Sequence, residues 1–407
     1  MKPEFELLVR CCGIARNIPK QFPPAQAQFP AGFDEGLFVR FAAQHKTAAT
    51  AQTGLKRLGL ALKPENAGKL RQFALQGRML RELIVEGASA ITEAAAKAGI
   101  PVLVLKGPAS SLQLYGDAFV REYTDLDLLV NLPTIDPALP FMTALGWEPD
   151  DYSPAEDSGR APSRLVMRGH HVVFWKKGCP FRVELHDRTS WERELFARDN
   201  IDGIFARAVR LEQDGKALFA PALPDHAALI IAHGTQHAWA LLHWLIDATV
   251  IAAIPGVETQ RTFAARICSL NMQCQLKLAC ELSRKLYTIE LPPAFESAII
   301  CQAPLDKSVA FAFARLQAGA SDMSTFRNMI DFRFTYASPL FRTARGKFSS
   351  AFMLFLIPPQ DIEALPLPRP LLFLHLFLRP FFVLSRRIQR LREKLRHERE
   401  SKVRVHG

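Results

Sequence analysis

Several patterns that define common protein classes are missing from this chain of 407 residues. Its seven cysteines are scattered and never spaced C-x-x-C, so neither a disulfide framework nor a zinc ribbon is indicated. Walker A, G-x-G-x-x-G after a strand and G-x-S-x-G are also absent, which leaves ATPase, Rossmann dehydrogenase and α/β-hydrolase interpretations without support. Glu4 and Glu6 interrupt the apolar core that a secretion signal needs. Together with the scattered thiols, this predicts a cytoplasmic protein.

The excess of positive charge is concentrated at one end of the chain. Lys plus Arg number 51 and Asp plus Glu 40, a net charge of +11. Residues 386–407 hold nine basic and three acidic residues, so this short segment carries six of the eleven excess charges. The rest of the chain is therefore only weakly basic, and nucleic acid is not expected as its main partner.

The pattern of the sequence predicts four segments. Residues 1–98 have helical spacing and form an N-terminal helical region. Residues 99–222 read as an α/β core with strands at 101–106 and 124–131, helices at 109–115 and 134–145, and a hairpin that pairs 170–175 with 181–186. Residues 223–357 read as a larger helical domain, broken at Pro255, Pro292 and Pro304. Residues 358–407 contain a proline-rich hinge, an apolar segment and a basic helix.

The apolar segment at 371–384 has two interpretations. At 14 residues, and interrupted by His375, Arg379 and Pro380, it is too short and too polar for an ordinary membrane span. It could instead lie in the inner membrane interface while the basic helix meets anionic lipid, a peripheral contact through residues 371–404. The alternative is a terminal helix that docks on the helical domain.

Three carboxylates are the candidates for chemistry. On a strand Asp125 and Asp127 point to one face, while Leu126, Leu128 and Val130 point to the core. Like charges so close repel unless a cation lies between them, and oxygen ligands of this kind select Mg²⁺ or Mn²⁺. If the strand that carries Glu184 pairs beside them, a third acid completes a two-metal clamp.

The same residues have an ordinary structural interpretation. Asp125 and Asp127 could mark a strand end, and Glu184 could be a solvated position on a half-exposed sheet. The turn at Gly107 opens a helix and could present backbone N–H groups to a phosphate, with Lys106 beside it as a point charge. Alternatively, Lys106 could simply extend from a strand end into solvent.

Separated motifs in this order resemble a known family. They are Val102 to Gly107 (Val-Leu-Val-Leu-Lys-Gly), Leu114-Tyr115, Arg121, Asp125 to Val130, Val183 to His186 (Val-Glu-Leu-His), His237, and Trp244-Leu-Ile-Asp247. Over residues 70–290 the chain resembles the uncharacterised nucleotidyltransferases within the DNA polymerase beta-like superfamily. The wider superfamily usually has Gly-Ser in its turn, whereas here Pro108 follows Gly107, and Ser110 and Ser111 come later.

The resemblance implies an α+β fold, with a small mixed sheet of the nucleotidyltransferase type wrapped by helices. It implies that Asp125, Asp127 and Glu184 are catalytic metal ligands and that Lys106 and Gly107 form the phosphate-side turn. It also implies that Arg121 contacts the triphosphate or the substrate. The substrate cleft would then include His186.

Two further polar residues belong to the predicted helices. His233 and His237 are four residues apart and could share a zinc ion, but the glutamate of zinc proteases is missing because Gly234 follows His233. We prefer to place His237 and Asp247 in the cleft between the helical domain and the sheet, or in the core as a hydrogen-bonded pair. The run His170-His171 is expected at the surface of an edge strand.

These observations predict a Mg²⁺-dependent nucleotidyltransferase that transfers a nucleoside monophosphate from an NTP to an acceptor and releases pyrophosphate. A peptide, a small metabolite and a sugar phosphate all remain open as the acceptor. The alternative is a noncatalytic nucleotide-binding or regulatory protein that keeps the fold. A helical scaffold with incidental acids requires that the three carboxylates do not meet in space.

Overall fold

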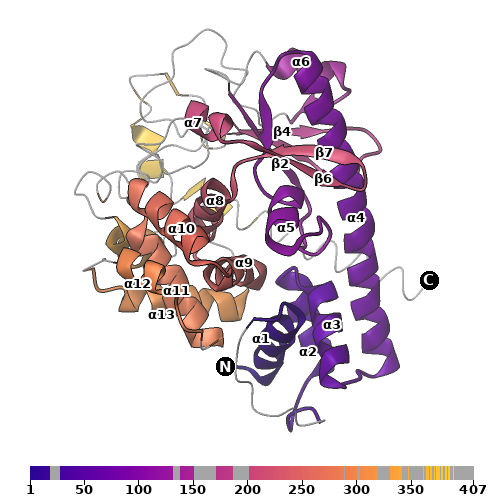
Figure 1. Ribbon diagram of the computed structural model, residues 1–407, viewed down its shortest axis with the longest axis vertical. Coiled ribbons are helices and arrows are strands. Elements are labelled where there is room, and N and C mark those ends of the chain that lie inside the picture. Colours follow the sequence, from indigo (N-terminus) through magenta and orange to yellow (C-terminus); the bar gives the residue numbers. More distant parts are fainter. Residues whose placement is uncertain are drawn as a thin grey trace.

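The structure is a computed structural model that describes residues 1–18, 28–131, 138–150, 171–186, 201–287, 289–299, 303–319 and 331–341, with scattered positions between 347 and 388. A small sheet and the long helix α4 (Pro64–Lys97) lie on one side of the molecule, and the C-terminal helices lie on the other (Figure 1). The three N-terminal helices pack at the far end of α4 from the sheet. They are α1 (Pro3–Ala15), α2 (Glu35–Gln44) and α3 (Ala48–Leu58).

The main sheet has five strands in the order β1-β2-β5-β4-β3. Its central strand β2 (Leu126–Val130) runs antiparallel to β1 (Val102–Val104) and parallel to β5 (Val183–His186). On the other side of β5 lie β4 (His171–Trp175) and β3 (Glu148–Pro149), both joined by antiparallel pairing. A separate ribbon of β6 (Val209–Gln213) and β7 (Lys216–Ala220) packs against α4. The sheet is therefore mixed, as the sequence predicts.

One face of the sheet forms an apolar core with α4. Leu126, Leu128 and Val130 of β2 and Val183 and Leu185 of β5 are all buried in one cluster, together with side chains of α4. Since side chains alternate along a strand, Asp127, Glu184 and His186 must point to the opposite face. That second face is covered in part by α7 (Ile201–Ala206) and α8 (Leu223–Gln236), whose Ile204 and Leu229 pack on Leu129.

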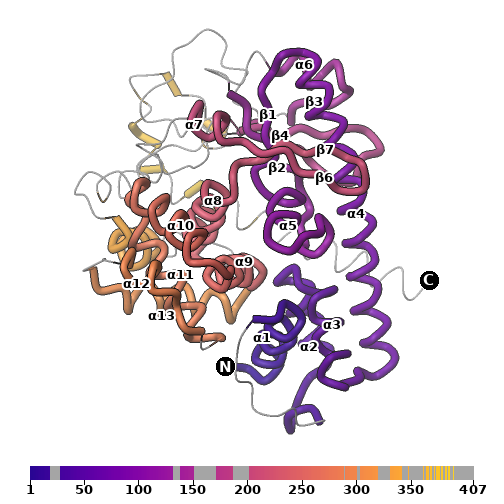
Figure 2. The backbone as a smooth tube through the Cα atoms, in the orientation of Figure 1, coloured from indigo at the N-terminus to yellow at the C-terminus, as the bar shows by residue number. Residues whose placement is uncertain are grey.

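The helices that precede α4 and those that follow residue 222 share a single core. Buried residues of α1, α2 and α3 cluster with buried residues of the helices that follow residue 222, and Figure 2 shows these two distant parts of the chain running side by side. After α8 these helices are α9 (Leu242–Ala253), α10 (Val257–Ser269), α11 (Gln273–Tyr287), α12 (Pro293–Ala298), α13 (Asp306–Ala318), the π-helix η4 (Asp331–Ala337) and the 3₁₀ turn η5 (Ser338–Leu340). The predicted breaks at Pro255, Pro292 and Pro304 fall between them.

Local sequence explains where the elements near the sheet begin and end. The long helix α4 starts with Pro64 in its first turn, and Gly99 follows its last residues with a φ of +69°. The helix α5 (Pro108–Tyr115) starts after Gly107 and ends at Gly116, which also has a positive φ. The shorter helix α6 (Leu139–Ala144) occupies the end of the helix predicted at 134–145.

The described cysteines Cys11, Cys12, Cys179, Cys268 and Cys280 are free thiols, whereas Cys274 is disulfide-bonded, which the spacing did not predict. Among the described helices, none combines the length and low charge needed to cross a bilayer. All nine basic residues of 386–407 lie outside the described residues, as does His170.

Candidate functional site

Parallel pairing brings the predicted carboxylates to one place. In the register of β2 and β5, Asp127 lies beside Glu184, and Asp125 directly precedes β2 on the same side of the chain. All three line one cavity of about 350 Å³ between the sheet and the helices. Asp127 is 6% exposed, so its charge sits in a poorly solvated position. The three acids therefore line the same cavity, and their role as joint metal ligands stays a prediction.

Two basic groups already neutralise Asp127. The Nζ atom of Lys106 lies 2.9 Å from Asp127 Oδ1, and His186 Nε2 lies 3.1 Å from the same oxygen. Burial on its own would raise the pKa of Asp127, but Lys106 and His186 outweigh burial and hold that pKa well below its ordinary value. Burial acts to lower the pKa of His186, and its hydrogen bonds with Asp127 and Glu184 raise it instead.

Asp125 has the opposite electrostatic environment. Burial, followed by the charge of Asp127, raises the pKa of the Asp125 carboxyl, despite Lys46 and Lys106 nearby. The pKa of Asp125 is raised and that of Asp127 is lowered, although the two carboxyls share one buried site. Additional positive charge beside them would therefore be favourable. Three carboxylate donors around one cavity suit a hard divalent cation such as Mg²⁺ or Mn²⁺.

The turn between β1 and α5 also lines the cavity. Gly107 lines it and has φ +60° and ψ −116°, a conformation that a residue with a side chain rarely adopts. A Cβ atom at Gly107 would make only an ordinary contact with the ring of Tyr123, at 3.4 Å, so the backbone conformation is what favours glycine here. Pro108 has no backbone N–H, so this turn has one donor fewer than a Gly-Ser turn.

The two serines after the turn do not replace the missing hydroxyl. Ser110 Oγ lies 2.9 Å from His226 Nε2, and Ser111 Oγ donates to the carbonyl of Asp117 at 2.7 Å. Both serines are buried, and neither lines the cavity. Their hydroxyls hold α5 in place, so the phosphate side of the cavity depends on backbone and on cationic side chains.

Arg121 lines the cavity, and a buried network fixes its position. Its Nε donates to Asp247 Oδ2 at 2.6 Å, and Tyr115 Oη donates to Asp247 Oδ1 at 2.6 Å. Asp247 is 1% exposed and is not among the cavity residues. Asp247 therefore does not line the cleft as expected. It is buried next to Arg121, and its carboxylate holds the guanidinium in position at the cavity.

Aromatic side chains of α8 and α9 form the wall that faces the sheet. The ring of His233 lies 4.6 Å from that of His237 and 4.9 Å from that of Trp244. His237 therefore lines the cavity as expected, and His233 Nδ1 lies 3.4 Å from Lys106 Nζ. In the part of the chain that the structure describes, these two histidines belong to no three-ligand metal cluster.

Lys46 and His171 are among the cavity residues that sequence reasoning did not place there. Lys46, between α2 and α3, has φ +51°, and its Nζ donates to Thr124 Oγ1 at 3.0 Å. No local motif marks Lys46, because its place depends on how the N-terminal helices dock. The expectation for His171 was wrong: its strand β4 lies between β5 and β3 rather than at an edge, and its side chain lines the cavity.

The mixed five-stranded sheet, with acids on adjacent parallel strands facing a glycine turn, is that of a protein with the nucleotidyltransferase fold. The comparison with protein families agrees. A family described as uncharacterised nucleotidyltransferases matches residues 31–288, and the chain belongs to this family. A search of curated proteins finds no match.

Proposed function

We propose that this protein transfers a nucleoside monophosphate from an NTP to an acceptor, in a reaction that depends on Mg²⁺ or Mn²⁺. The observation that carries the proposal is the register of β2 and β5, which sets Asp127 beside Glu184 at a cavity that Asp125 also lines. At about 350 Å³ the cavity falls within the range of small-molecule sites.

In this proposal the carboxylates of the cavity bind metal ions, and its lysines and the turn at Gly107 bind phosphate. Asp125, Asp127 and Glu184 would hold the divalent ions, which when bound activate the attacking oxygen and stabilise the charge on the leaving group. Lys46 and Lys106 would bind phosphate oxygens as point charges, beside the backbone of the turn at Gly107. An oxygen of the acceptor attacks the α-phosphorus, the bond from that phosphorus to the bridging oxygen breaks, and pyrophosphate leaves.

The acceptor would enter along the helical wall. His237 and Trp244 face the cavity from α8 and α9, opposite the carboxylates, and offer ring faces and nitrogen atoms rather than charge. Burial, with a contribution from Lys106, keeps the pKa of His233 well below its ordinary value, so this ring is neutral at pH 7. A neutral wall of this kind offers hydrogen bonds and ring contacts, and it leaves a peptide, a small metabolite and a sugar phosphate all open as the acceptor.

Pyrophosphate release from each of the four NTPs with Mg²⁺ tests the proposal. Wild type is expected to release pyrophosphate with one or more NTPs once candidate acceptors are supplied, and chelation of the metal is expected to stop the release. No pyrophosphate above the level of the Asp127→Asn variant, with any NTP and acceptor, would reject catalysis at this site.

One observation favours the alternative of a noncatalytic nucleotide-binding protein. Pro108 stands where the wider superfamily usually has serine, and the hydroxyls of Ser110 and Ser111 are bonded elsewhere. Calorimetric titration separates the two functions. An NTP that binds wild type in the presence of Mg²⁺, binds weakly to Asp127→Asn, and yields no pyrophosphate supports the regulatory function instead.

We also propose that residues 371–404 contact an anionic membrane surface. Phe373, Phe377, Phe381 and Leu384 recur at helical spacing and are each more than 45% exposed, and the sequence that follows is strongly basic. In flotation, the full chain is expected to rise with vesicles rich in phosphatidylserine and to be released by high salt. Equal recovery with neutral vesicles, or no flotation of either, contradicts the contact.

A further inference from the structure

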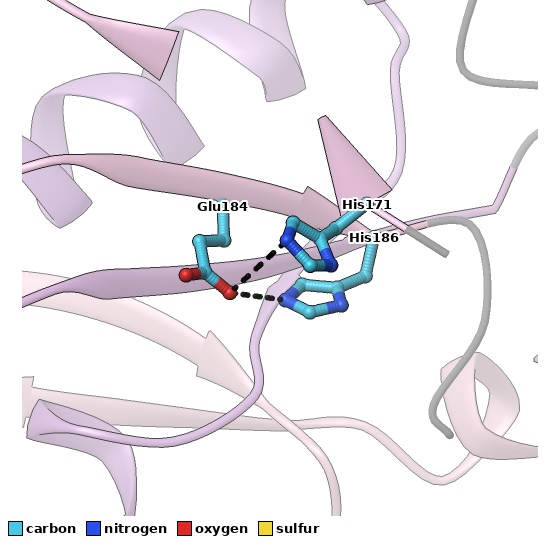
Figure 3. Close-up of side chains that lie close together, drawn as sticks. All are labelled: His171, Glu184 and His186. Carbon is cyan, nitrogen blue, oxygen red and sulfur yellow. Dashed lines mark ion pairs between the residues drawn. The ribbon is translucent and has the colours of Figure 1, made fainter. Parts of the chain in front are cut away.

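Two histidines outside the proposed carboxylate set converge with Glu184 on the same face of the sheet. In the antiparallel pair of β4 and β5, His171 lies directly opposite His186, and Val173 lies opposite Glu184. Cross-strand partners share a face, and so do residues two apart on one strand. His171, Glu184 and His186 therefore project together, and Figure 3 shows both rings turned toward the glutamate.

The spacing of their ligand atoms matches that around a metal ion. Glu184 Oε2 lies 3.6 Å from His186 Nε2 and 3.8 Å from His171 Nε2, and the ligand atoms of all three residues lie within 4.8 Å of one another (Figure 3). An ion with bonds of about 2.0–2.2 Å to nitrogen and oxygen holds its ligand atoms roughly 3–4 Å apart. Small side-chain movements would close this set around one ion.

The chemistry of the three ligands selects a class of metal. Mg²⁺ prefers an octahedral set of oxygens, whereas imidazole nitrogen suits zinc, cobalt and other first-row transition metals. Two imidazoles and one carboxylate thus disfavour Mg²⁺. The site is also open to solution, because the side chains of His171 and Glu184 are 20% and 30% exposed on the cavity.

Asp127 lies directly beside the cluster. His186 is almost fully buried, and its Nε2, the nitrogen that faces Glu184, also lies 3.1 Å from Asp127 Oδ1, so an ion bound at Nε2 would replace this hydrogen bond. Asp127 is in turn held by Lys106. The cluster shares Glu184 with the proposed carboxylate site and takes its nitrogen ligands from β4 and β5.

We propose that His171, Glu184 and His186 bind one divalent transition-metal ion, of the zinc and cobalt class, in preference to Mg²⁺. Binding at this site does not require that the protein turn over a nucleotide. The inference therefore goes beyond the proposed function, and each can fail while the other holds.

Titration of the full-length protein with Co²⁺ tests the site, because the visible spectrum of Co²⁺ reports its ligands. Wild type is expected to bind one equivalent with visible absorption bands that Zn²⁺ displaces and millimolar Mg²⁺ does not. The partly exposed variant His171→Ala should bind Co²⁺ more than about 100-fold less tightly, since loss of even an outer partner costs 10-fold to 100-fold. The matched variant His237→Ala changes the same residue type on the opposite wall and should bind as wild type does.

Several results would overturn the site. Co²⁺ affinity that is unchanged in His171→Ala but lost in Asp125→Asn would place the ion on the carboxylates alone. Affinity lost in His237→Ala and kept in His171→Ala would place it on the helical wall. Circular dichroism confirms that the variants are folded. Pyrophosphate release with Mg²⁺, measured on the same preparations, reports the proposed function separately.

Discussion

The Asp127→Asn variant is expected to release pyrophosphate at least about 100-fold more slowly than wild type. The substitution keeps the size of the side chain but removes the charge that lies 2.9 Å from Lys106 and beside Glu184 in the sheet. A catalytic divalent ion supplies several kcal/mol of transition-state stabilisation, and each 1.36 kcal/mol is tenfold in rate. The loss should therefore appear in kcat and should persist at high concentrations of NTP and Mg²⁺.

The same substitution at an exposed aspartate away from the cavity is the control for this prediction. Asp214 is exposed in the turn between β6 and β7, and it has φ +51°, where asparagine is well tolerated. Asp214→Asn should release pyrophosphate at the rate of wild type. If Asp127→Asn is as fast as Asp214→Asn while both are folded, the reaction does not use this site.

The second large effect concerns stability. The Asp247→Ala variant is expected to lose about 3–5 kcal/mol of unfolding free energy, because it leaves the guanidinium of Arg121 buried without its counter-ion. The side chain of Arg121 is 7% exposed, and Tyr115 Oη loses its acceptor in the same change. Urea unfolding followed by circular dichroism measures the loss, and NTP affinity should fall as well because Arg121 lines the cavity.

An exposed pair of the same residue types is the control for Asp247. Asp150 Oδ2 lies 3.0 Å from Arg182 Nη1, but the arginine is 64% exposed, so Asp150→Ala should cost less than about 1 kcal/mol. Replacement of the whole network by Tyr115→Phe, Arg121→Met and Asp247→Leu together should recover most of the stability. Equal losses in Asp247→Ala and Asp150→Ala would show that burial of this network does not matter.

The strand patterns allowed much of the site to be predicted. In the segments around Asp127 and Glu184 polar and apolar residues alternate. Because successive side chains of a strand point to opposite faces, the polar residues lie on one face and the apolar residues on the other. The hairpin of β4 and β5 was also predicted, since a short turn separates its strands in the sequence. The parallel pairing of β2 with β5 could not be predicted from local sequence. The sequence indicated only that the site would form if the strand that carries Glu184 paired beside the strand that carries Asp127.

The contributions of the N-terminal helices and of β4 could not be predicted in the same way. Lys46 reaches the cavity because Glu122 accepts a hydrogen bond from the backbone N–H of Ala49 at 2.8 Å and so holds that part of the chain beside β2. The partners of this contact are separated by 73 residues, and no local pattern encodes such a distance. His171 was misplaced for a related reason, since the position of a strand within a sheet depends on pairing between distant segments.

By itself, the sequence determined which side chains each strand presents on its polar face, and therefore which carboxylates are available, because the two-residue repeat of a strand is a local property. Only the tertiary structure decided how those residues are paired with positive charge. It put Lys106 and His186 against Asp127, buried Asp247 behind Arg121, and brought Lys46 and His171 to the cavity. Electrostatic energies depend on distance and burial between segments that are far apart in the chain, and packing alone sets those quantities.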